Sequence, residues 1–164
     1  MKTMKVVIPG VLTTVQDLGR FGYQKSGMTC SGVMDTAAYR KANYLVGNEE
    51  GAAVLEMTLY GGSCRFEEDT VIALTGADMQ PTVNQKPIAM NQAVKVPAVG
   101  VLNLGMAKTG CRTYLAVAGG FEVPKVMGSY STNLKCGIGG HEGRALQMGN
   151  ELPIGEALHS WDEV

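Results

Sequence analysis

One stretch of this sequence indicates the fold more clearly than any other: Thr13-Thr14-Val15-Gln16-Asp17-Leu18-Gly19-Arg20-Phe21-Gly22-Tyr23-Gln24. It places an amide, a carboxylate and a guanidinium within five positions and follows them with glycines and a tyrosine. Arginine offers a planar fork of donors that suits a carboxylate or phosphate, and glycine lets the backbone approach a ligand closely. The same residues also fit a strand that ends in a hydrogen-bonded turn, so the residues alone leave both interpretations open.

Further motifs follow in the same chain: Ser31-Gly32-Val33-Met34-Asp35, Leu74-Thr75-Gly76-Ala77-Asp78 and Tyr114-Leu115-Ala116-Val117-Ala118-Gly119-Gly120. Taken in this order with the first stretch, they resemble the allophanate hydrolase subunit 2 family, also called the carboxyltransferase A/B-type or Kip-antagonist family. The resemblance runs from about Val7 to Pro153 and implies a cyclophilin-like β-barrel. Family members are usually longer, so we expect residues 1–164 to form a single carboxyltransferase-type domain that corresponds to the N-terminal part of the usual family length.

The bulk properties exclude several classes of function. A chain of 164 residues fits one domain, and 14 basic against 15 acidic residues favour neither a nucleic acid nor an anionic membrane as partner. No apolar run approaches the roughly 20 residues of a membrane span, and Pro9-Gly10 breaks the N-terminal one, so we expect a cytoplasmic protein. Four widely spaced cysteines and two histidines predict free thiols and no metal site.

Short apolar runs with turn residues between them predict a mainly β fold. Segments such as Gly61-Gly62 and Asn84-Gln85 separate the runs, as is typical of a β-sandwich or β-barrel. Thr113–Val117 is mostly apolar, which predicts a strand covered on both faces. The strands are expected at Lys5–Ile8, Val54–Leu59, Thr70–Thr75, Ala93–Val96, Gly100–Leu104 and Arg112–Ala118.

One principal helix is predicted over Asp35–Val46. Asp35 is a good N-cap residue, and Ala38, Ala42 and Leu45 recur near a period of 3.6 residues. Gly47 supplies a C-terminal stop. We expect this helix to plug or flank the barrel.

Asp17, Glu56 and Asp78 are the candidate catalytic carboxylates. Asp17 can accept a proton or orient a substrate that Arg20 holds, or it can pair with Arg20 across a turn. Glu56 lies inside an apolar strand, so it either points to solvent or is held by a partner such as Arg20 or Arg112. Asp78 follows a strand and a glycine, a position that fits both a pocket lining and an ordinary turn.

The candidate substrate-binding residues are polar or cationic side chains in or near the motifs. Ser31 would need a histidine or lysine base to act as a nucleophile, and two histidines do not assemble a triad, so a serine hydrolase is not favoured. An anion-accepting wall is expected from Arg112 and the run Gly128–Thr132, although family members commonly carry an arginine where Tyr130 stands. The full set is Arg20, Gln24, Ser31, Asn43, Arg112 and Arg144.

Two glycine-rich segments are expected to form loops at the site. The segment Gly137–Arg144 lacks the Gly-Lys-Ser/Thr ending of a P-loop and fails the dinucleotide fingerprint. It fits a loop that closes over a substrate, with Arg144 reaching inward. The loop glycines are Gly119, Gly120, Gly139 and Gly140, and the resemblance implies these positions.

The resemblance implies a subunit of an ATP-dependent amidohydrolase that opens a cyclic amide, 5-oxoproline, to give glutamate. Its partners would be an allophanate hydrolase subunit 1-type protein and a LamB/YcsF-type subunit, and ATP would bind through the complex. One alternative is a biotin-dependent carboxyltransferase component acting on urea or a similar amide, with biotin on a separate carrier, because no biotin-acceptor motif is present. The other is a regulatory binding module that antagonises a kinase inhibitor.

Overall fold

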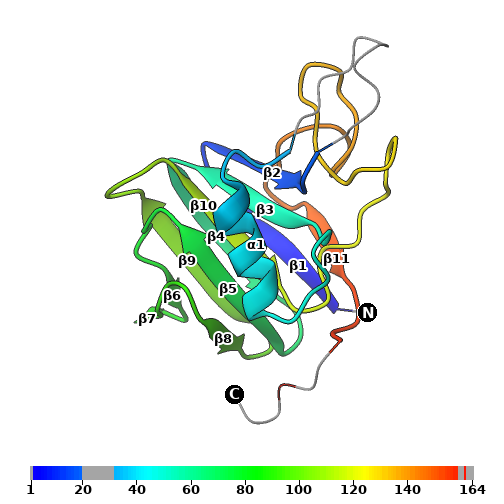
Figure 1. Ribbon diagram of the computed structural model, residues 1–164. Helices are drawn as coiled ribbons and strands as arrows, with labels where there is room; N and C mark the ends of the chain where they lie inside the picture. Colours follow the sequence, from blue (N-terminus) through cyan, green and yellow to red (C-terminus); the bar gives the residue numbers. More distant parts are fainter. Residues whose placement is uncertain (1, 20–31, 159–160, 162–164) are drawn as a thin grey trace.

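The computed structural model describes residues 2–19, 32–158 and 161 (Figure 1). Within these residues the chain forms one α-helix and eleven β-strands. They follow in the order β1 (Lys2–Ile8), β2 (Leu12–Gln16), α1 (Thr36–Leu45), β3 (Val54–Thr58), β4 (Tyr60–Phe66), β5 (Thr70–Gly76), β6 (Thr82–Val83), β7 (Lys86–Pro87), β8 (Ala93–Val96), β9 (Gly100–Met106), β10 (Arg112–Val117) and β11 (Glu151–Ile154).

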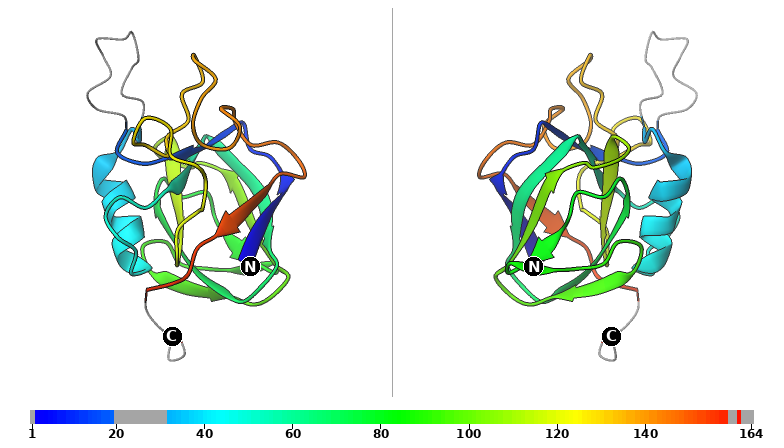
Figure 2. Two further views of the ribbon diagram at one scale, coloured as in Figure 1. Left: turned by 90° about the vertical axis from the view of Figure 1, so that its right-hand side faces the viewer. Right: turned by 90° about the vertical axis from the view of Figure 1, so that its left-hand side faces the viewer.

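The strands form two antiparallel sheets around a common core. One sheet has the order β11-β1-β4-β9-β6-β7, and the other has the order β2-β3-β10-β5-β8. Figure 2 shows the two sheets curving around one interior, with the helix outside it. Side chains from both sheets fill this interior, among them the buried Phe66 and Leu102 of the first sheet and Leu55 and Leu115 of the second. The fold is therefore mainly β with one principal helix, as the sequence predicts.

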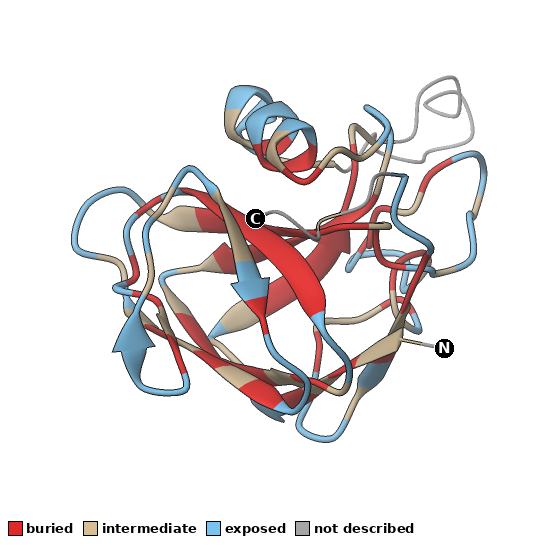
Figure 3. Cartoon of the chain, turned by 90° about the horizontal axis from the view of Figure 1, so that it is seen from below, coloured by how far each residue is buried: buried red, intermediate tan, exposed pale blue. Residues whose placement is uncertain are grey.

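Helix α1 flanks the barrel and does not plug it. Asp35 caps its first turn, because the Asp35 carboxylate accepts a hydrogen bond from the Ala38 amide at 3.0 Å. Tyr39 and Ala42 pack against the outer face of β5 and β10, where the buried side of the helix meets the sheet in Figure 3. In the part of the chain that the structure describes, no helix has the length and apolar character needed to span a membrane.

Strand β10 is covered on both faces, as its composition predicts. Tyr114 and Ala116 belong to the cluster beneath the helix, whereas Leu115 and Val117 belong to the barrel core. All four side chains are buried. Because β10 is the middle strand of its sheet and is anchored on both sides, it forms a rigid support for side chains at its ends.

The prediction that Gly61-Gly62 forms a turn was wrong, because both glycines lie inside β4. A Cβ atom at Gly61 would lie 2.6 Å from the Leu104 Cβ, and one at Gly62 would lie 2.2 Å from the Ile8 carbonyl oxygen. Gly62 also has a positive φ of 76°. The glycines therefore let β4 pass close to β9 and β1, which is a packing requirement and not a turn signal.

Strand β11 pairs with β1 and was not predicted. The register places Lys2 opposite Ile154 and Thr3 opposite Pro153. Proline has no amide hydrogen to donate and is tolerated where one side of a strand has no partner. Strand β11 is the outer strand of its sheet, which explains how a proline-containing segment pairs there.

Candidate functional site

Asp17 ties the end of β2 to a loop far along the chain. Its Oδ1 atom accepts hydrogen bonds from the Ser129 hydroxyl at 2.6 Å, the Ser131 hydroxyl at 2.7 Å and the Gly19 amide at 2.8 Å. Its Oδ2 atom accepts one from the Tyr130 amide at 2.9 Å. Asp17 is 7% exposed, and both serines are fully buried. This carboxylate is saturated with donors from the protein, so it holds the 128–132 segment in place.

Glu56 lies near the start of α1, inside a hydrogen-bond network. Its Oε2 atom accepts from the Tyr114 hydroxyl at 2.8 Å and from the Met34 amide at 2.8 Å. The Tyr114 hydroxyl in turn accepts from the Asp35 amide at 2.9 Å. Burial, and next the hydrogen bond to Glu56, raise the pKa of Tyr114 above its ordinary value, so the phenol stays protonated and keeps donating. The network therefore fixes the Glu56 carboxylate relative to the helix.

Arg112 extends from the start of β10 toward the remaining oxygen of Glu56. Its Nε atom lies 3.9 Å from Glu56 Oε1, an ion-pair distance that is too long for a hydrogen bond. Among the described residues this Nε atom has no hydrogen-bond partner although it is buried, while the whole side chain is 34% exposed. The guanidinium is thus charged, partly open and incompletely paired, a combination that suits a carboxylate or amide ligand.

A hollow of about 500 Å³ opens beside this arginine. Gly76 stands at its edge with a φ of 89°, and a Cβ atom there would lie 2.5 Å from the Arg112 carbonyl oxygen. Glycine at this position lets the end of β5 cross close to β10. The lining residues are Met34, Asp35, Gly76, Ala77, Thr109, Gly110, Cys111 and Arg112. We call this group, together with Glu56 and Tyr114, the barrel-end site.

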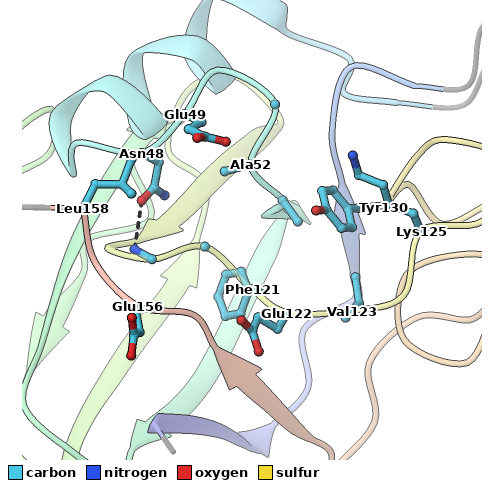
Figure 4. A pocket seen from close by; sticks show the side chains of 14 residues that line it. Asn48, Glu49, Ala52, Phe121, Glu122, Val123, Lys125, Tyr130, Glu156 and Leu158 are labelled. Atoms are coloured by element: carbon cyan, nitrogen blue, oxygen red, sulfur yellow. Dashed lines mark hydrogen bonds between the residues drawn. The ribbon is translucent and has the colours of Figure 1, made fainter.

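A second hollow, of about 480 Å³, lies between the segment that follows α1 and the segment that follows β10 (Figure 4). Asn48 joins the two walls, because its amide group donates to the Val117 carbonyl at 2.8 Å and its oxygen accepts from the Gly119 amide at 2.9 Å. The Lys125 ammonium lies 5.1 Å from the centre of the Tyr130 ring. The wall formed by the segment that follows β10 contains the predicted loop glycines Gly119 and Gly120.

Two further predicted residues, Asn43 and Asp78, do not line the barrel-end hollow. Asn43 is buried in the helix and donates to the Ala52 carbonyl at 3.0 Å, while its oxygen accepts from Asn48 at 3.0 Å. Asp78 is exposed in a turn, where it accepts from the Gln80 amide at 2.8 Å. These contacts give both residues a structural role that the sequence did not distinguish from a role at the site.

Arg144 and the glycine-rich segment form a loop that is hydrogen-bonded both internally and to neighbouring segments. Arg144 donates to Asn150 at 3.0 Å and to Glu142 at 2.5 Å. Gly140 donates its amide to the Tyr130 carbonyl at 2.9 Å, and Gly139 accepts from the Gly143 amide at 2.8 Å. Several backbone amides of this loop are therefore already paired, some within the loop and some with the segment that precedes it.

Arg20, Gln24 and Ser31 lie outside the described residues. Within the described ranges, no cluster of three or more histidine, cysteine, aspartate or glutamate side chains is arranged to hold a metal ion. The barrel-end site therefore consists here of Glu56 and Arg112 from the predicted residues, joined by groups that the sequence analysis did not select.

Tyr114 is the main residue that sequence reasoning missed. It stands directly opposite Glu56 in the pairing of β10 with β3. A tyrosine within an apolar strand usually needs a partner for its hydroxyl, and a glutamate within the neighbouring strand needs a donor. Recognising that these two requirements satisfy each other would have identified the pair.

Comparisons with known proteins agree with this architecture. The family described as carboxyltransferase domain, subdomain A and B, matches residues 26–164. The chain is 46% identical over 154 residues to a 5-oxoprolinase subunit of Escherichia coli, covering 94% of this chain and 50% of the relative. It is 42% identical over 149 residues to the urea amidolyase of Lachancea kluyveri, covering 90% of this chain and 8% of that protein.

A solved structure gives the same result for the fold. The urea carboxylase of Kluyveromyces lactis superposes with a TM-score of 0.91 at 40% identity, covering 93% of this chain and 14% of that one. The chain thus spans half the length of the bacterial relative and a small part of the fungal enzymes.

Proposed function

The chain belongs to the carboxyltransferase domain, subdomain A and B family, and on this premise we propose that it is the substrate-holding part of an ATP-dependent amidohydrolase. In this proposal it acts with partner subunits to open a small cyclic amide, 5-oxoproline, to glutamate. The observation that carries the proposal is the 46% identity to a bacterial 5-oxoprolinase subunit over 94% of the chain. The partners in this proposal are an allophanate hydrolase subunit 1-type protein and a LamB/YcsF-type subunit.

The barrel-end site supports this choice of substrate. A cyclic amide that carries a carboxylate offers one anionic group and one polar carbonyl, and Arg112 has an unpaired buried Nε atom beside a hollow of about 500 Å³. In the proposal, the guanidinium binds the substrate carboxylate. Opening the ring adds water to the carbonyl carbon and breaks the C–N bond, so one proton must leave the water and one must reach the nitrogen. Glu56 Oε1 accepts no hydrogen bond from the described residues, and it is the group we assign to this proton transfer.

ATP is assigned to a partner subunit and not to the glycine-rich loop of this chain. The Gly140 amide donates to Tyr130, the Gly143 amide donates to Gly139, and the Gly137 amide donates to Asn133. A phosphate cradle needs several free amides that point at the ligand. Several amides of this loop are therefore already paired, and its sequence lacks the Gly-Lys-Ser/Thr ending of a P-loop, so no chemical step in this chain is derived through a nucleotide.

A second candidate is a carboxyltransferase component that uses biotin on a separate carrier protein. The resemblance to the fungal urea carboxylase, at a TM-score of 0.91 and 40% identity, favours it. The same Arg112 and Glu56 would then face urea or a similar amide, which lacks the carboxylate of 5-oxoproline. The two candidates therefore differ in how much binding depends on the positive charge of Arg112.

The test is 5-oxoproline-dependent ATP hydrolysis by the partner subunits, with this chain added or omitted. We expect turnover to require the chain and to fall at least about tenfold in each of the variants Arg112→Met and Glu56→Gln. The first variant loses the charge-assisted contact with the substrate carboxylate, and the second loses the group that transfers the proton. Arg65→Met is the matched control, since Arg65, on β4, is a similarly exposed arginine, and it pairs with Glu67 at 2.9 Å.

The possible results separate the candidates. Turnover that does not depend on the chain contradicts the proposal. Biotin-dependent carboxylation of urea, without 5-oxoproline turnover, would favour the second candidate. Tight binding to the partners without either reaction would favour the regulatory module that antagonises a kinase inhibitor.

A further inference from the structure

A third hollow, of about 480 Å³, lies at the opposite end of β5 from the barrel-end site. It is lined by Thr70 at the start of β5, by Val96 at the end of β8, and by Trp161 near the end of the described chain. Its lining includes Lys2, so the hollow lies at the end of the barrel where β1 begins; the start of β1 is marked N in Figure 1. Nothing in the proposed function uses this hollow.

Two buried polar groups at this hollow lack partners. Among the described residues, four buried side-chain nitrogen or oxygen atoms make no hydrogen bond, and two of them, Thr70 Oγ1 and Trp161 Nε1, belong to residues that line it. Thr70 is only 6% exposed. An unpaired buried polar group is costly, so native proteins rarely keep one unless water, an ion or a ligand satisfies it. Two such groups in one hollow indicate a missing acceptor.

The charged groups around the hollow favour an anionic acceptor. Lys2, at the start of β1, also lines it and carries an ammonium group. The carboxylate of Asp69, which lines it as well, accepts the Ala98 amide at 2.8 Å and so belongs to the turn that precedes β5. An indole N–H and an ammonium group can only donate, and a hydroxyl can donate. The hollow therefore offers a set of donors that matches an anion.

The remaining walls are apolar and limit the kind of anion. Val71 and Val96 are buried, and Pro97, Ala118 and Ala157 complete the apolar part of the lining. A fully hydrated inorganic anion would leave these walls without contact, whereas an apolar body would cover them. We infer that this hollow binds a small organic carboxylate with a compact apolar body, through the Thr70 and Trp161 donors and the positive charge of Lys2.

Trp161 is the single tryptophan of the chain, so intrinsic tryptophan fluorescence reports on ligands that bind beside it, and the substitutions below assign the signal to this hollow. The probe is cyclohexanecarboxylate, titrated into the 164-residue protein, with cyclohexanecarboxamide as its neutral counterpart and inorganic phosphate as an anion without an apolar body. We expect a saturable fluorescence change with the carboxylate and at least about tenfold weaker binding of the other two compounds. The carboxamide lacks the negative charge, and phosphate lacks the apolar body.

Substitutions locate the binding. Thr70→Val keeps the shape of the side chain and removes the unpaired hydroxyl, so we expect about tenfold weaker carboxylate binding with no loss of thermal stability. Thr13→Val is the matched control, because Thr13 also carries a buried unpaired hydroxyl and is also 6% exposed, yet it lines a separate cavity of about 20 Å³. Arg112→Met tests whether the anion sits at the barrel-end site instead. Both controls should bind as the unchanged chain does.

Several outcomes would overturn the inference. The first is the absence of a fluorescence change up to about 10 mM carboxylate, since a dissociation constant above that concentration is too weak for a specific site. The second is equal binding of the carboxylate and of the carboxamide or phosphate. Equal weakening by Thr70→Val and Thr13→Val would also overturn it, as would loss of binding in Arg112→Met. Since no step uses ATP or 5-oxoproline, failure here leaves the proposed function untouched, and the reverse also holds.

Discussion

Replacing Asp17 with asparagine should destabilise the fold strongly although it changes only one atom of the side chain. Oδ1 accepts three hydrogen bonds and Oδ2 accepts one, and the serine donors are fully buried. The least costly placement of asparagine keeps its oxygen at the Oδ1 position and turns its NH₂ group toward the Tyr130 amide. One buried amide then faces another donor, at a cost of about 1–2 kcal/mol, and the other three bonds lose their charge assistance, at about 0.5 kcal/mol each. The sum is about 3 kcal/mol.

The assay is equilibrium unfolding in urea, followed by far-UV circular dichroism. A loss of about 3 kcal/mol corresponds to a melting temperature about 6–12 °C lower for a domain of this size. Asp78→Asn is the matched control: Asp78 is exposed and accepts only the Gln80 amide with its side chain, and asparagine can do the same, so we expect a change below about 0.5 kcal/mol.

A double-mutant cycle with Ser131→Ala sharpens this test. The Ser131 hydroxyl donates to Asp17 and also accepts the Asp17 amide at 2.9 Å. We expect the two substitutions together to cost about 1 kcal/mol less than their sum, because both remove the same contact. If Asp17→Asn costs less than about 1 kcal/mol, or no more than Asp78→Asn, the reasoning that this carboxylate holds the 128–132 segment is refuted.

Other substitutions test the barrel-end site, the glycine-rich loop and the core. Tyr114→Phe removes the hydroxyl between Glu56 and the start of α1, so we expect a loss of about 2 kcal/mol in urea unfolding and faster amide exchange at Asp35; unchanged exchange there would contradict the network. Gly140→Ala places a Cβ atom 2.0 Å from a threonine hydroxyl and should cost at least about 2 kcal/mol, whereas Gly128→Ala meets nothing within 4 Å and should cost about 1 kcal/mol for its positive φ alone; equal losses would show that crowding is not the cause. Burial raises the pKa of the Cys64 thiol to about 12, above its value of about 8.5 in the unfolded chain. The thiol therefore contributes fully to the free energy of unfolding below about pH 8.5. Above that pH its contribution falls by up to about 1.4 kcal/mol per pH unit, because the unfolded chain loses the proton first. Cys64→Ala should make the decline in unfolding free energy between about pH 9 and 10 shallower, and an unchanged slope would exclude the thiol as its source.

The mainly β fold and its helix follow from local patterns in the sequence. Asp35 caps the helix as predicted, and the predicted strand at Ala93–Val96 has the observed bounds. These features depend on neighbouring residues, namely a capping side chain and a short apolar run. A local pattern is therefore sufficient for them.

Features that depend on contacts between distant residues were not predictable in the same way. Gly61-Gly62 reads as a turn, and only the positions of Leu104 and Ile8 show that the glycines allow close strand packing. Strand β11 contains Pro153 and forms because β1 offers it an edge. The local sequence of each segment therefore does not predict these features.

The same distinction between local patterns and distant contacts applies to the residues of the candidate site. Glu56 and Arg112 were selected from their residue types, and the structure brings them within 3.9 Å of each other because β10 pairs with β3. Asp17 was selected for the same reason, yet its four donors come from Gly19 and from a segment more than a hundred residues away. A carboxylate that orients loops and one that faces a ligand look alike until the donors around them are known.

The pairing of β1 with β11 has a consequence for synthesis on the ribosome. Strand β1 is made well before its partner, and its outer edge stays unpaired until residues 151–154 have also been made. An open strand edge can join other chains, and closure over such a sequence separation is slow. A nascent chain therefore carries an open strand edge while the residues between β1 and β11 are made, and a fragment that contains β1 but stops before residue 151 keeps it.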